Sequence, residues 1–322
     1  MSVPPPDAAR RFDVLAVGEP LYELAEAAVE GRPVYLPGFG GDVSNVAVAV
    51  ARQGGRAAIH TRLGDDAFGR RFLELWRAEG VDASTVEVDA SAHTGVYFIG
   101  YGPAGHEFSY LREGSAASLM RPEGLPLGAI AASRVLHVSA ISQAISPSAC
   151  DAVFAAVEAA RERGTAVSYD TNLRLSLWPL ARARAVILAT VGMADYCLPS
   201  LDDAASLTGL RDPDAVADEL LRLGAKVVVL KLGAEGALVA DPVRRVRLPG
   251  HAVELVDATG AGDCFDGAFL ARVAAGDDPV EAARYANAAA ALSVTGRGAV
   301  APIPTAAAVR AFLAHGGEPA RG

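Results

Sequence analysis

The chain contains 322 residues, of which 51% are AVILMFWYC and 21% are charged, so it can bury a sizeable core and is not an intrinsically disordered protein. Lysine and arginine number 29 against 38 aspartates and glutamates, which gives a formal net charge of −9. This balance argues against nucleic acids and anionic membranes as partners, because binding to them needs clustered cations.

The cysteines and the N-terminus indicate the compartment. Cys150, Cys197 and Cys264 are far apart and lack the spacing of a disulfide framework or a zinc site, which is typical of a reducing compartment. Residues 1–11 are rich in proline and lack the apolar segment of a signal peptide. No stretch approaches the ~18 apolar residues of a membrane span. We therefore expect a soluble cytoplasmic protein.

Apolar runs alternate with stretches of helical periodicity along most of the chain. The runs predict buried strands at 12–18, 57–63, 135–139, 166–170, 196–198, 227–231 and 237–240. The periodic stretches predict helices at 44–53, 66–79, 147–163, 181–189, 201–208, 215–223, 264–275, 278–295 and 306–314. Such alternation predicts an α/β fold, with a mostly parallel sheet and helices on both faces.

Two β-rich segments do not fit this alternation. One covers about residues 20–37, and the other covers about residues 94–112 with a hairpin turn at Gly102–Gly105. Although they are separated in sequence, they could join into one small sheet that acts as a lid over the end of the main sheet. No linker and no internal repeat divides the chain, so we expect a single domain, residues 1–322, that carries this lid.

A glycine-rich motif, Asp257–Asp263, directly precedes a helix that is expected to be amphipathic. Its glycines permit a tight turn, and the helix N-terminus adds unpaired N–H groups that attract an anion. A carboxylate at that place, Asp263, makes sense if it handles a proton. The alternative is an ordinary loop with Asp263 as the helix cap. The motif lacks the lysine of a P-loop.

A second glycine cluster, Gly38–Asp42, is followed by Asn45 at the start of another helix. Gly40 and Gly41 would let a polyol approach the backbone, and the amide of Asn45 offers both a donor and an acceptor. The alternative is a strand-to-helix loop with no ligand.

Together the two motifs resemble the signature regions of the PfkB, or ribokinase-like, carbohydrate kinases. The first region is Gly40–Ala47 and the second is Asp257–Asp263, and Gly64–Gly69 and Lys231–Gly236 also match in order. The resemblance runs over essentially the whole chain. It implies a ribokinase-like three-layer α/β/α sandwich, with a mostly parallel central sheet and a small β-sheet lid.

This resemblance implies roles for the site residues. Asp263 is expected to be the base that takes the proton from the acceptor hydroxyl, and Gly260, Ala261 and Gly262 are expected to form an anion hole for the γ-phosphoryl group of ATP. The residues implied to bind ATP are Ser200, Lys231, Gly233, Gly236, Gly260, Gly262 and Asn287. The residues implied to surround a monovalent cation, for example K⁺, are Asp257, Thr259, Ser293, Gly296 and Gly298.

Magnesium is expected together with ATP, but one family feature is altered. Where the family commonly has Asn-x-x-Glu, which organises magnesium-bound water, this chain reads Ser200-Leu-Asp-Asp203. Asp203 keeps a carboxylate and is the implied contact to that water, whereas Ser200 loses the amide. The alternative is that Ser200 only caps the helix that follows.

Four residues point to the acceptor. Tyr110 and Arg112 alternate on a lid strand and share one face, while Asn172 and Arg174 follow a buried strand, at the end where open α/β sheets bind ligands. Because an arginine binds a carboxylate in a fork, two arginines beside a tyrosine suggest an acidic sugar. The alternative for both arginines is a structural ion pair.

With Tyr97 as an upstream lid tyrosine, these residues resemble the branch of the family that phosphorylates the primary hydroxyl of 2-keto-3-deoxygluconate. Kinases for 5-dehydro-2-deoxygluconate share part of this set, and fructokinases and ribokinases share the core motifs, so these acceptors remain alternatives. A non-catalytic sugar or nucleotide sensor is a third. Because family members often assemble through the lid, the expected partners are a sugar acid, ATP and further copies of this chain.

Overall fold

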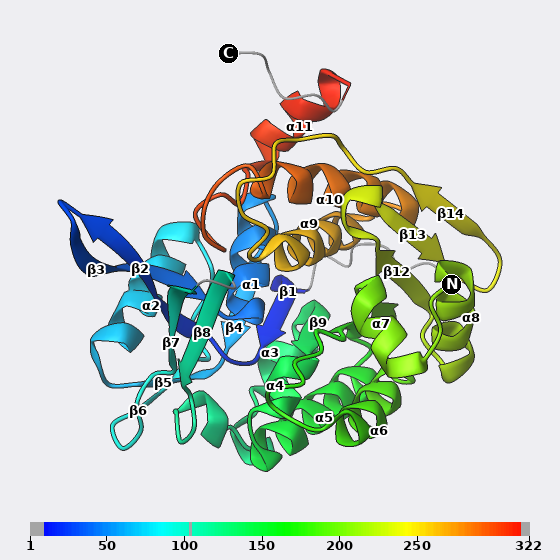
Figure 1. Ribbon diagram of the computed structural model, residues 1–322. Coiled ribbons are helices and arrows are strands. Elements are labelled where there is room, and N and C mark those ends of the chain that lie inside the picture. The colour runs from blue at the N-terminus through cyan, green and yellow to red at the C-terminus, as the bar shows by residue number, and fades with distance from the viewer. Residues whose placement is uncertain (1–9, 103–104, 317–322) are drawn as a thin grey trace.

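The computed structural model describes residues 10–102 and 105–316. Its main sheet has eight strands and lies at the centre of the fold (Figure 1). The strand order is β14-β13-β12-β11-β10-β9-β1-β4. Neighbours from β4 to β12 pair in parallel, and β13 and β14 are added antiparallel at one edge. The strands are β1 (Phe12–Val17), β4 (Ala57–His60), β9 (Ser133–Ser139), β10 (Ala166–Asp170), β11 (Tyr196–Cys197), β12 (Val227–Lys231), β13 (Ala237–Ala240) and β14 (Arg245–Leu248).

Helices cover both faces of this sheet, which confirms the predicted layered fold. Alternate residues of β1 point to opposite faces: Val14 and Ala16 join one hydrophobic core, and Leu15 and Val17 join the other. The first core is completed by α1, α9 and α10, and the second by α5, α6 and α8. The helices are α1 (Asp42–Arg52), α2 (Ala67–Glu79), α3 (Leu127–Ala131), α4 (Ala140–Ala144), α5 (Pro147–Glu162), α6 (Leu180–Val191), α7 (Leu201–Thr208), α8 (Pro213–Leu223), α9 (Ala261–Ala275), α10 (Pro279–Ser293) and α11 (Ala306–Ala314), with short 3₁₀ turns η1 (Ala117–Leu119), η2 (Pro122–Gly124) and η3 (Gly233–Glu235).

Helix α9 differs from the amphipathic helix expected at 264–275. It begins at Ala261, so that Asp263 lies in its first turn, and it is buried on nearly every face between α1, α10 and the sheet. A helix in the middle of a core has no polar face to show. At Gly267 it touches α1 so closely that a β carbon would lie 2.4 Å from the Cβ of Ala49.

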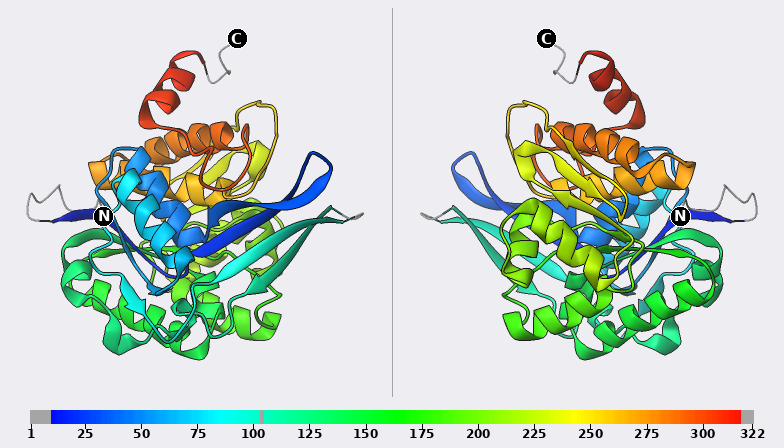
Figure 2. Two further views of the ribbon diagram at one scale, coloured as in Figure 1. Left: turned by 90° about the vertical axis from the view of Figure 1, so that its left-hand side faces the viewer. Right: turned by 90° about the vertical axis from the view of Figure 1, so that its right-hand side faces the viewer.

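A second sheet has the strand order β3-β2-β7-β8 and projects from the body in Figure 2. Its strands are β2 (Leu21–Val29), β3 (Arg32–Gly40), β7 (Val96–Gly102) and β8 (Gly105–Leu111), so the two β-rich segments of the sequence lie side by side. β2 pairs with β3 antiparallel and with β7 in parallel. Pro33 and Pro37 are tolerated because β3 is an edge strand.

Some strands do not follow the apolar runs. The strand expected at 57–63 is broken at Thr61, and Arg62–Gly64 (β5) pairs instead with Glu87–Asp89 (β6). β14 was not predicted, because its arginines mask the alternation. Arg245 and Arg247 of this edge strand form ion pairs with α8 carboxylates. Over the described residues, none of the helices is long and apolar enough to span a bilayer.

Candidate active site

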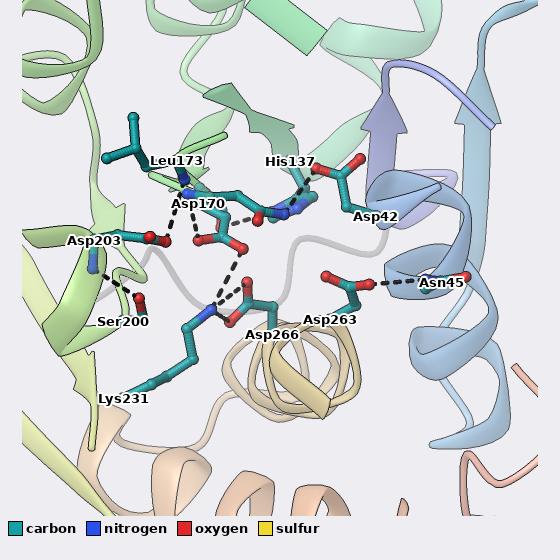
Figure 3. A network of polar contacts seen from close by, with 12 residues as sticks. Asp42, Asn45, His137, Asp170, Leu173, Ser200, Asp203, Lys231, Asp263 and Asp266 are labelled. Atoms are coloured by element: carbon teal, nitrogen blue, oxygen red, sulfur yellow. Dashed lines mark hydrogen bonds and ion pairs between the residues drawn. The ribbon is translucent and has the colours of Figure 1, made fainter. Parts of the chain in front are cut away.

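Five carboxylates from different elements gather at the carboxyl end of the parallel strands, where open α/β sheets bind ligands (Figure 3). They come from the start of α1, the end of β10, the start of α7 and the first turns of α9. These carboxylates belong to Asp42, Asp170, Asp203, Asp263 and Asp266. Such a concentration of like charge at one edge of the sheet is costly, and it marks a functional site more than a structural one.

Asp263 lies where a proton acceptor is expected. Its Oδ2 accepts a hydrogen bond of 2.8 Å from Nδ2 of Asn45 on α1. Burial, followed by the nearby carboxylates of Asp42 and Asp170, raises the pKa of Asp263, the Asn45 hydrogen bond and the charge of Lys231 lower it, and the net value is about 7. A carboxylate with a pKa near the working pH can accept and release a proton.

The glycine-rich motif becomes the N-terminus of α9. Gly260 caps the helix with φ of 73°, a left-handed conformation that favours glycine, and a β carbon there would lie 3.0 Å from Ala299. Ala261 and Gly262 are already helical. The first-turn N–H groups of a helix have no intrahelical acceptors, so they are available to an anion beside Asp263.

Lys231, at the end of β12, points into the carboxylate cluster rather than toward the turn that follows it (Figure 3). Its Nζ lies 2.9 Å from Oδ1 of Asp266 and 3.4 Å from Oδ2 of Asp170. Asp170 begins the Asp-x-Asn-x-Arg element that the sequence places after a buried strand, whereas Asp266 was not singled out from the sequence. The available signal for Asp266 was a carboxylate inside a strongly apolar helix.

Asn172 and Arg174 reach the same edge of the sheet from the segment after β10. Asn172 donates from Nδ2 to Oδ2 of Asp42 at 3.2 Å. The amide that was expected to contact the acceptor thus binds a carboxylate of the protein. Arg174 is exposed, donates to the carbonyl of Leu173 at 2.9 Å, and its charge lowers the pKa of Asp42 against the larger effect of burial.

The second sheet brings Tyr97, Tyr110 and Arg112 together. The Tyr97 and Tyr110 rings stack with centroids 5.9 Å apart, and the Arg112 guanidinium lies 5.0 Å from the centroid of the Tyr110 ring. Tyr97 donates from Oη to Glu23, and Arg112 donates to Glu19, which is fully buried. Arg112 is therefore already paired, and Glu19 is its missed partner. The sequence signal was a glutamate directly after the first buried strand.

Gly40 and Gly41 link this sheet to α1. A β carbon on Gly40 would lie 2.7 Å from Oη of Tyr97, and one on Gly41, where φ is 88°, would lie 2.5 Å from the carbonyl oxygen of Glu19. The close approach of protein atoms thus explains both glycines.

Comparison with known proteins identifies the family. The pattern of the pfkB family carbohydrate kinases matches residues 14–306. The chain is 37% identical over 303 residues to 2-dehydro-3-deoxygluconokinase of Thermoproteus tenax, which covers 91% of this chain and 92% of that protein. It is 34% identical over 316 residues to probable fructokinase-4 of Arabidopsis thaliana, with 93% and 96% covered. The chain belongs to the PfkB family of carbohydrate kinases.

Solved structures agree with this PfkB membership. A putative ribokinase II from E. coli in complex with ATP and Mg²⁺ is similar with a TM-score of 0.87 and 27% identity, over 94% of this chain and 99% of that one. A fructokinase from Vibrio cholerae O395 in a form bound to fructose, ADP and calcium has a TM-score of 0.84 and 31% identity, over 95% and 100%. These similarities confirm the ribokinase-like fold.

Three of the residues implied to bind nucleotide in this PfkB kinase lie outside α9 and the carboxylate cluster. Gly233 and Gly236 form the turn between β12 and β13 with φ of 60° and 100°. Asn287 on α10 donates from Nδ2 to the carbonyl of Pro249 at 3.3 Å.

Ser200 and Asp203 lie at the start of α7, on the edge of the carboxylate cluster. Ser200 Oγ accepts from the Asp203 N–H at 3.1 Å, so it caps this helix, and Asp203 Oδ2 accepts from the Leu173 N–H at 3.2 Å. Within the described part of the chain, His, Cys, Asp and Glu side chains do not form a group of three or more that could hold a metal ion by themselves. Asp203 and Asp170 supply oxygen ligands of the kind that Mg²⁺ uses together with its waters and a phosphate.

The residues implied to surround a monovalent cation join two loops of the PfkB kinase. Asp257 accepts from the N–H and hydroxyl of Thr259 and, through its other oxygen, from the N–H of Gly298 at 2.9 Å. Ser293 donates to the carbonyl of Ala290, and Gly296 packs against Pro302. With these side chains engaged inside the protein, a cation here would depend largely on carbonyl oxygens. A cavity beside the loops is lined by Glu23, Ile99, Val256, Asp257, Thr259, Arg297 and Gly298.

Proposed function

We propose that this PfkB kinase transfers the γ-phosphoryl group of ATP to the primary hydroxyl of 2-keto-3-deoxygluconate. The observation that carries the transfer is the position of Asp263, beside the N-terminus of α9 and with a pKa near neutrality. The similarity to the 2-dehydro-3-deoxygluconokinase of T. tenax supports the acceptor.

In the proposed step Asp263 accepts the proton of the acceptor hydroxyl. The hydroxyl oxygen bonds to the γ-phosphorus, the bond from this phosphorus to the bridging oxygen of ADP breaks, and ADP leaves with the electron pair. The first-turn N–H groups at Gly260, Ala261 and Gly262 stabilise the charge on the transferring group. Bound Mg²⁺ would neutralise phosphate charge, with Asp203 and Asp170 as the residues that hold its waters.

The acceptor would lie between α1 and the second sheet. Asn45 orients Asp263, while Tyr97, Tyr110 and the backbone at Gly40 and Gly41 face the sugar. Arg112 keeps an Nε–H without a hydrogen-bond acceptor among the described residues, which supports a further partner for it, such as a ligand carboxylate. Arg174 and Asn172 complete the acceptor side.

A neutral ketohexose is the second candidate acceptor. It is favoured by the Glu19 partner of Arg112, which already neutralises one of the two arginines. Fructokinases between 33% and 36% identical to the chain support it as well.

Assembly and location complete the proposal. Several large apolar side chains of the second sheet are exposed, which favours contact with another copy of the chain. These are Val29, Tyr35, Leu36, Phe108 and Leu111. All three cysteines are free, as expected of a cytoplasmic kinase that uses cytoplasmic ATP.

Measurement of ATP-dependent phosphorylation over a panel of sugar acids and neutral sugars tests the acceptor. We expect kcat/KM for 2-keto-3-deoxygluconate to exceed that for the neutral sugars fructose and ribose by about 100-fold or more, the range set by one charged hydrogen-bonded contact, and to exceed that for 5-dehydro-2-deoxygluconate, which also carries a carboxylate, by less. A higher value for fructose would replace the first candidate by the second. ADP formation without any phosphorylated sugar would contradict both.

A further inference from the structure

The family resemblance implies only general ATP binding for Lys231 and no role for Asp266, yet their ion pair lies at the centre of the site (Figure 3). Lys231 Nζ contacts both carboxylate oxygens of Asp266, at 2.9 and 3.1 Å. The Asp266 side chain is 0% exposed and that of Lys231 is 13% exposed. Breaking such a pair leaves a buried charge uncompensated, and an apolar pair of similar size is often at least as stable. Stability alone therefore does not explain it.

The position of the ammonium points to a phosphate. Gly262 and Asp266 are four residues apart, so they lie on one face of α9. A β carbon on Gly262 would lie 3.5 Å from Nζ of Lys231. The ammonium thus lies alongside the first helical turn, next to the N–H groups that would receive the γ-phosphoryl group.

The charge around this place requires a cation. Asp42, Asp170, Asp263 and Asp266 surround the start of α9, and a phosphate that approaches them would be repelled. Burial raises the pKa of Asp42 and of Asp203 and the charge of Arg174 lowers it in part, but Arg174 itself is exposed to solvent. Lys231, in contrast, contacts two of the carboxylates directly and is nearly enclosed.

Asp266 keeps this cation charged and in place. A lysine side chain is flexible, and burial alone would lower the pKa of its ammonium. Here Nζ of Lys231 lies 2.9 Å from Oδ1 of Asp266 and 3.4 Å from Oδ2 of Asp170, so two carboxylates fix the ammonium in place. A group that is fixed and charged before the reaction needs no rearrangement during it.

We propose that Lys231 is a catalytic residue that contacts the transferring phosphoryl group, and that Asp266 is a positioning residue that acts through Lys231. This inference rests on the proposed phosphoryl transfer but not on the identity of the acceptor sugar.

The first experiment separates catalysis from folding. Lys231→Met is expected to lower kcat by about 100-fold or more, the loss found when one preorganised donor to a transition state is removed. Because Lys231→Met leaves Asp266 unpaired, the double variant K231M/D266L is also made. Its melting temperature is expected to return toward that of the wild type while kcat stays low. A double variant with wild-type kcat would overturn the proposal.

A matched control comes from the other lysine of the chain, Lys226, which is exposed and paired with Asp195. Lys226→Met makes the same chemical change and is expected to leave kcat unchanged. All variants are assayed with the sugar that the wild type phosphorylates fastest, so an error in the acceptor does not affect the result.

The positioning role of Asp266 predicts non-additive effects. Asp266→Asn is expected to lower kcat about 10-fold, and K231M/D266N to be no slower than Lys231→Met, because residues that act through one another do not add. An equal loss from Asp266→Asn in both backgrounds would show that Asp266 does not act through Lys231.

The last experiment needs no turnover. With only Lys226 and Lys231 in the chain, protein grown with ¹³C-labelled lysine gives two Cε signals. Addition of a non-hydrolysable ATP analogue with Mg²⁺ is expected to shift the Lys231 signal and not the Lys226 signal. Nucleotide binding that leaves the Lys231 signal in place would overturn the phosphoryl contact, even if the sugar acceptor is as proposed.

Discussion

The two sides of the site are built differently. On the phosphoryl side, Asp263, Asp266 and Lys231 project from α9 and the end of β12, elements locked into the hydrophobic core. On the acceptor side, Tyr110 and Arg112 project from or follow an edge strand of a sheet that stands away from the body, and Tyr110 is 43% exposed.

The two sides therefore differ in how freely their residues can change. Positions fixed by the core tolerate little change, so we expect the groups proposed to transfer phosphate to vary little among PfkB kinases. The second sheet joins the core through Tyr22 and Val96, but its exposed positions, such as Tyr110, can change without loss of the fold. Under the proposed function the choice of acceptor is made there, and relatives with similar identity are indeed named for different sugars.

The largest expected effect is on the phosphoryl side. Asp263→Asn keeps the shape of the side chain and its contact with Asn45 but removes the proton acceptor, so kcat is expected to fall about 10³-fold, within the range for a general base. Steady-state kinetics measure kcat, and calorimetry measures ATP binding, which should change little. A kcat of Asp263→Asn within tenfold of the wild-type value would show that Asp263 is not the base. It would also contradict the proposed difference between the two sides.

On the acceptor side we expect a smaller and selective effect. Arg112→Ala and Arg174→Ala should each lower kcat/KM for the sugar acid by about 10- to 100-fold, the worth of one hydrogen bond to a charged group, and change that for fructose much less. Since Arg112→Ala leaves Glu19 buried and unpaired, E19Q/R112A is the control for folding. Equal losses on both sugars would mean that the arginines shape the sheet and do not select the acceptor.

The pH profile is expected to report the phosphoryl side. Asp263 must be ionised to accept a proton, and its pKa is raised from 3.8 to about 7, first by burial. The ionised fraction therefore falls as the pH drops below 7, and kcat/KM should decrease about tenfold per pH unit below that value. A profile that stays flat down to pH 5 would contradict this assignment. The variant Lys226→Met is the control and is expected to show the same decrease in kcat/KM below pH 7.

The smallest expected effect concerns Tyr97. Tyr97→Phe keeps the ring that stacks on Tyr110 but removes the hydroxyl that donates to Glu23, so KM for the sugar is expected to rise about two- to tenfold, as for loss of one hydrogen bond. Tyr35→Phe, on an exposed part of the same sheet, is the matched control. A fall in kcat at constant KM would place Tyr97 on the phosphoryl side instead.

The sequence was sufficient for features that depend on local pattern. The parallel strands are continuous apolar runs, and the small second sheet was expected from segments that broke the alternation. The Gly260–Asp263 motif led to the helix N-terminus, since its glycines and its carboxylate are unusual together. β14 was missed because its arginines hide the apolar alternation of a strand. The start of α9 was missed because glycine is unfavourable in a helix and suggested that the loop continues.

Partners across the fold could not be read from the sequence. Asp266 is one of many acidic residues until β12 brings Lys231 against it, and the burial of Glu19 beside Arg112 depends on contact between segments 93 residues apart. Such pairs decide whether an arginine is available to a ligand. The prediction of Arg112 as a carboxylate site therefore omitted the group that competes for it.

The contact between α1 and α9 at Gly267 has a consequence for protein engineering. Replacement of a helical glycine by alanine is a common way to increase thermal stability. Here the added methyl group would push α1 away from α9, and these helices carry the two ends of the Asn45–Asp263 hydrogen bond. A substitution chosen to make the enzyme more robust would thus reduce its activity from a position that no ligand touches.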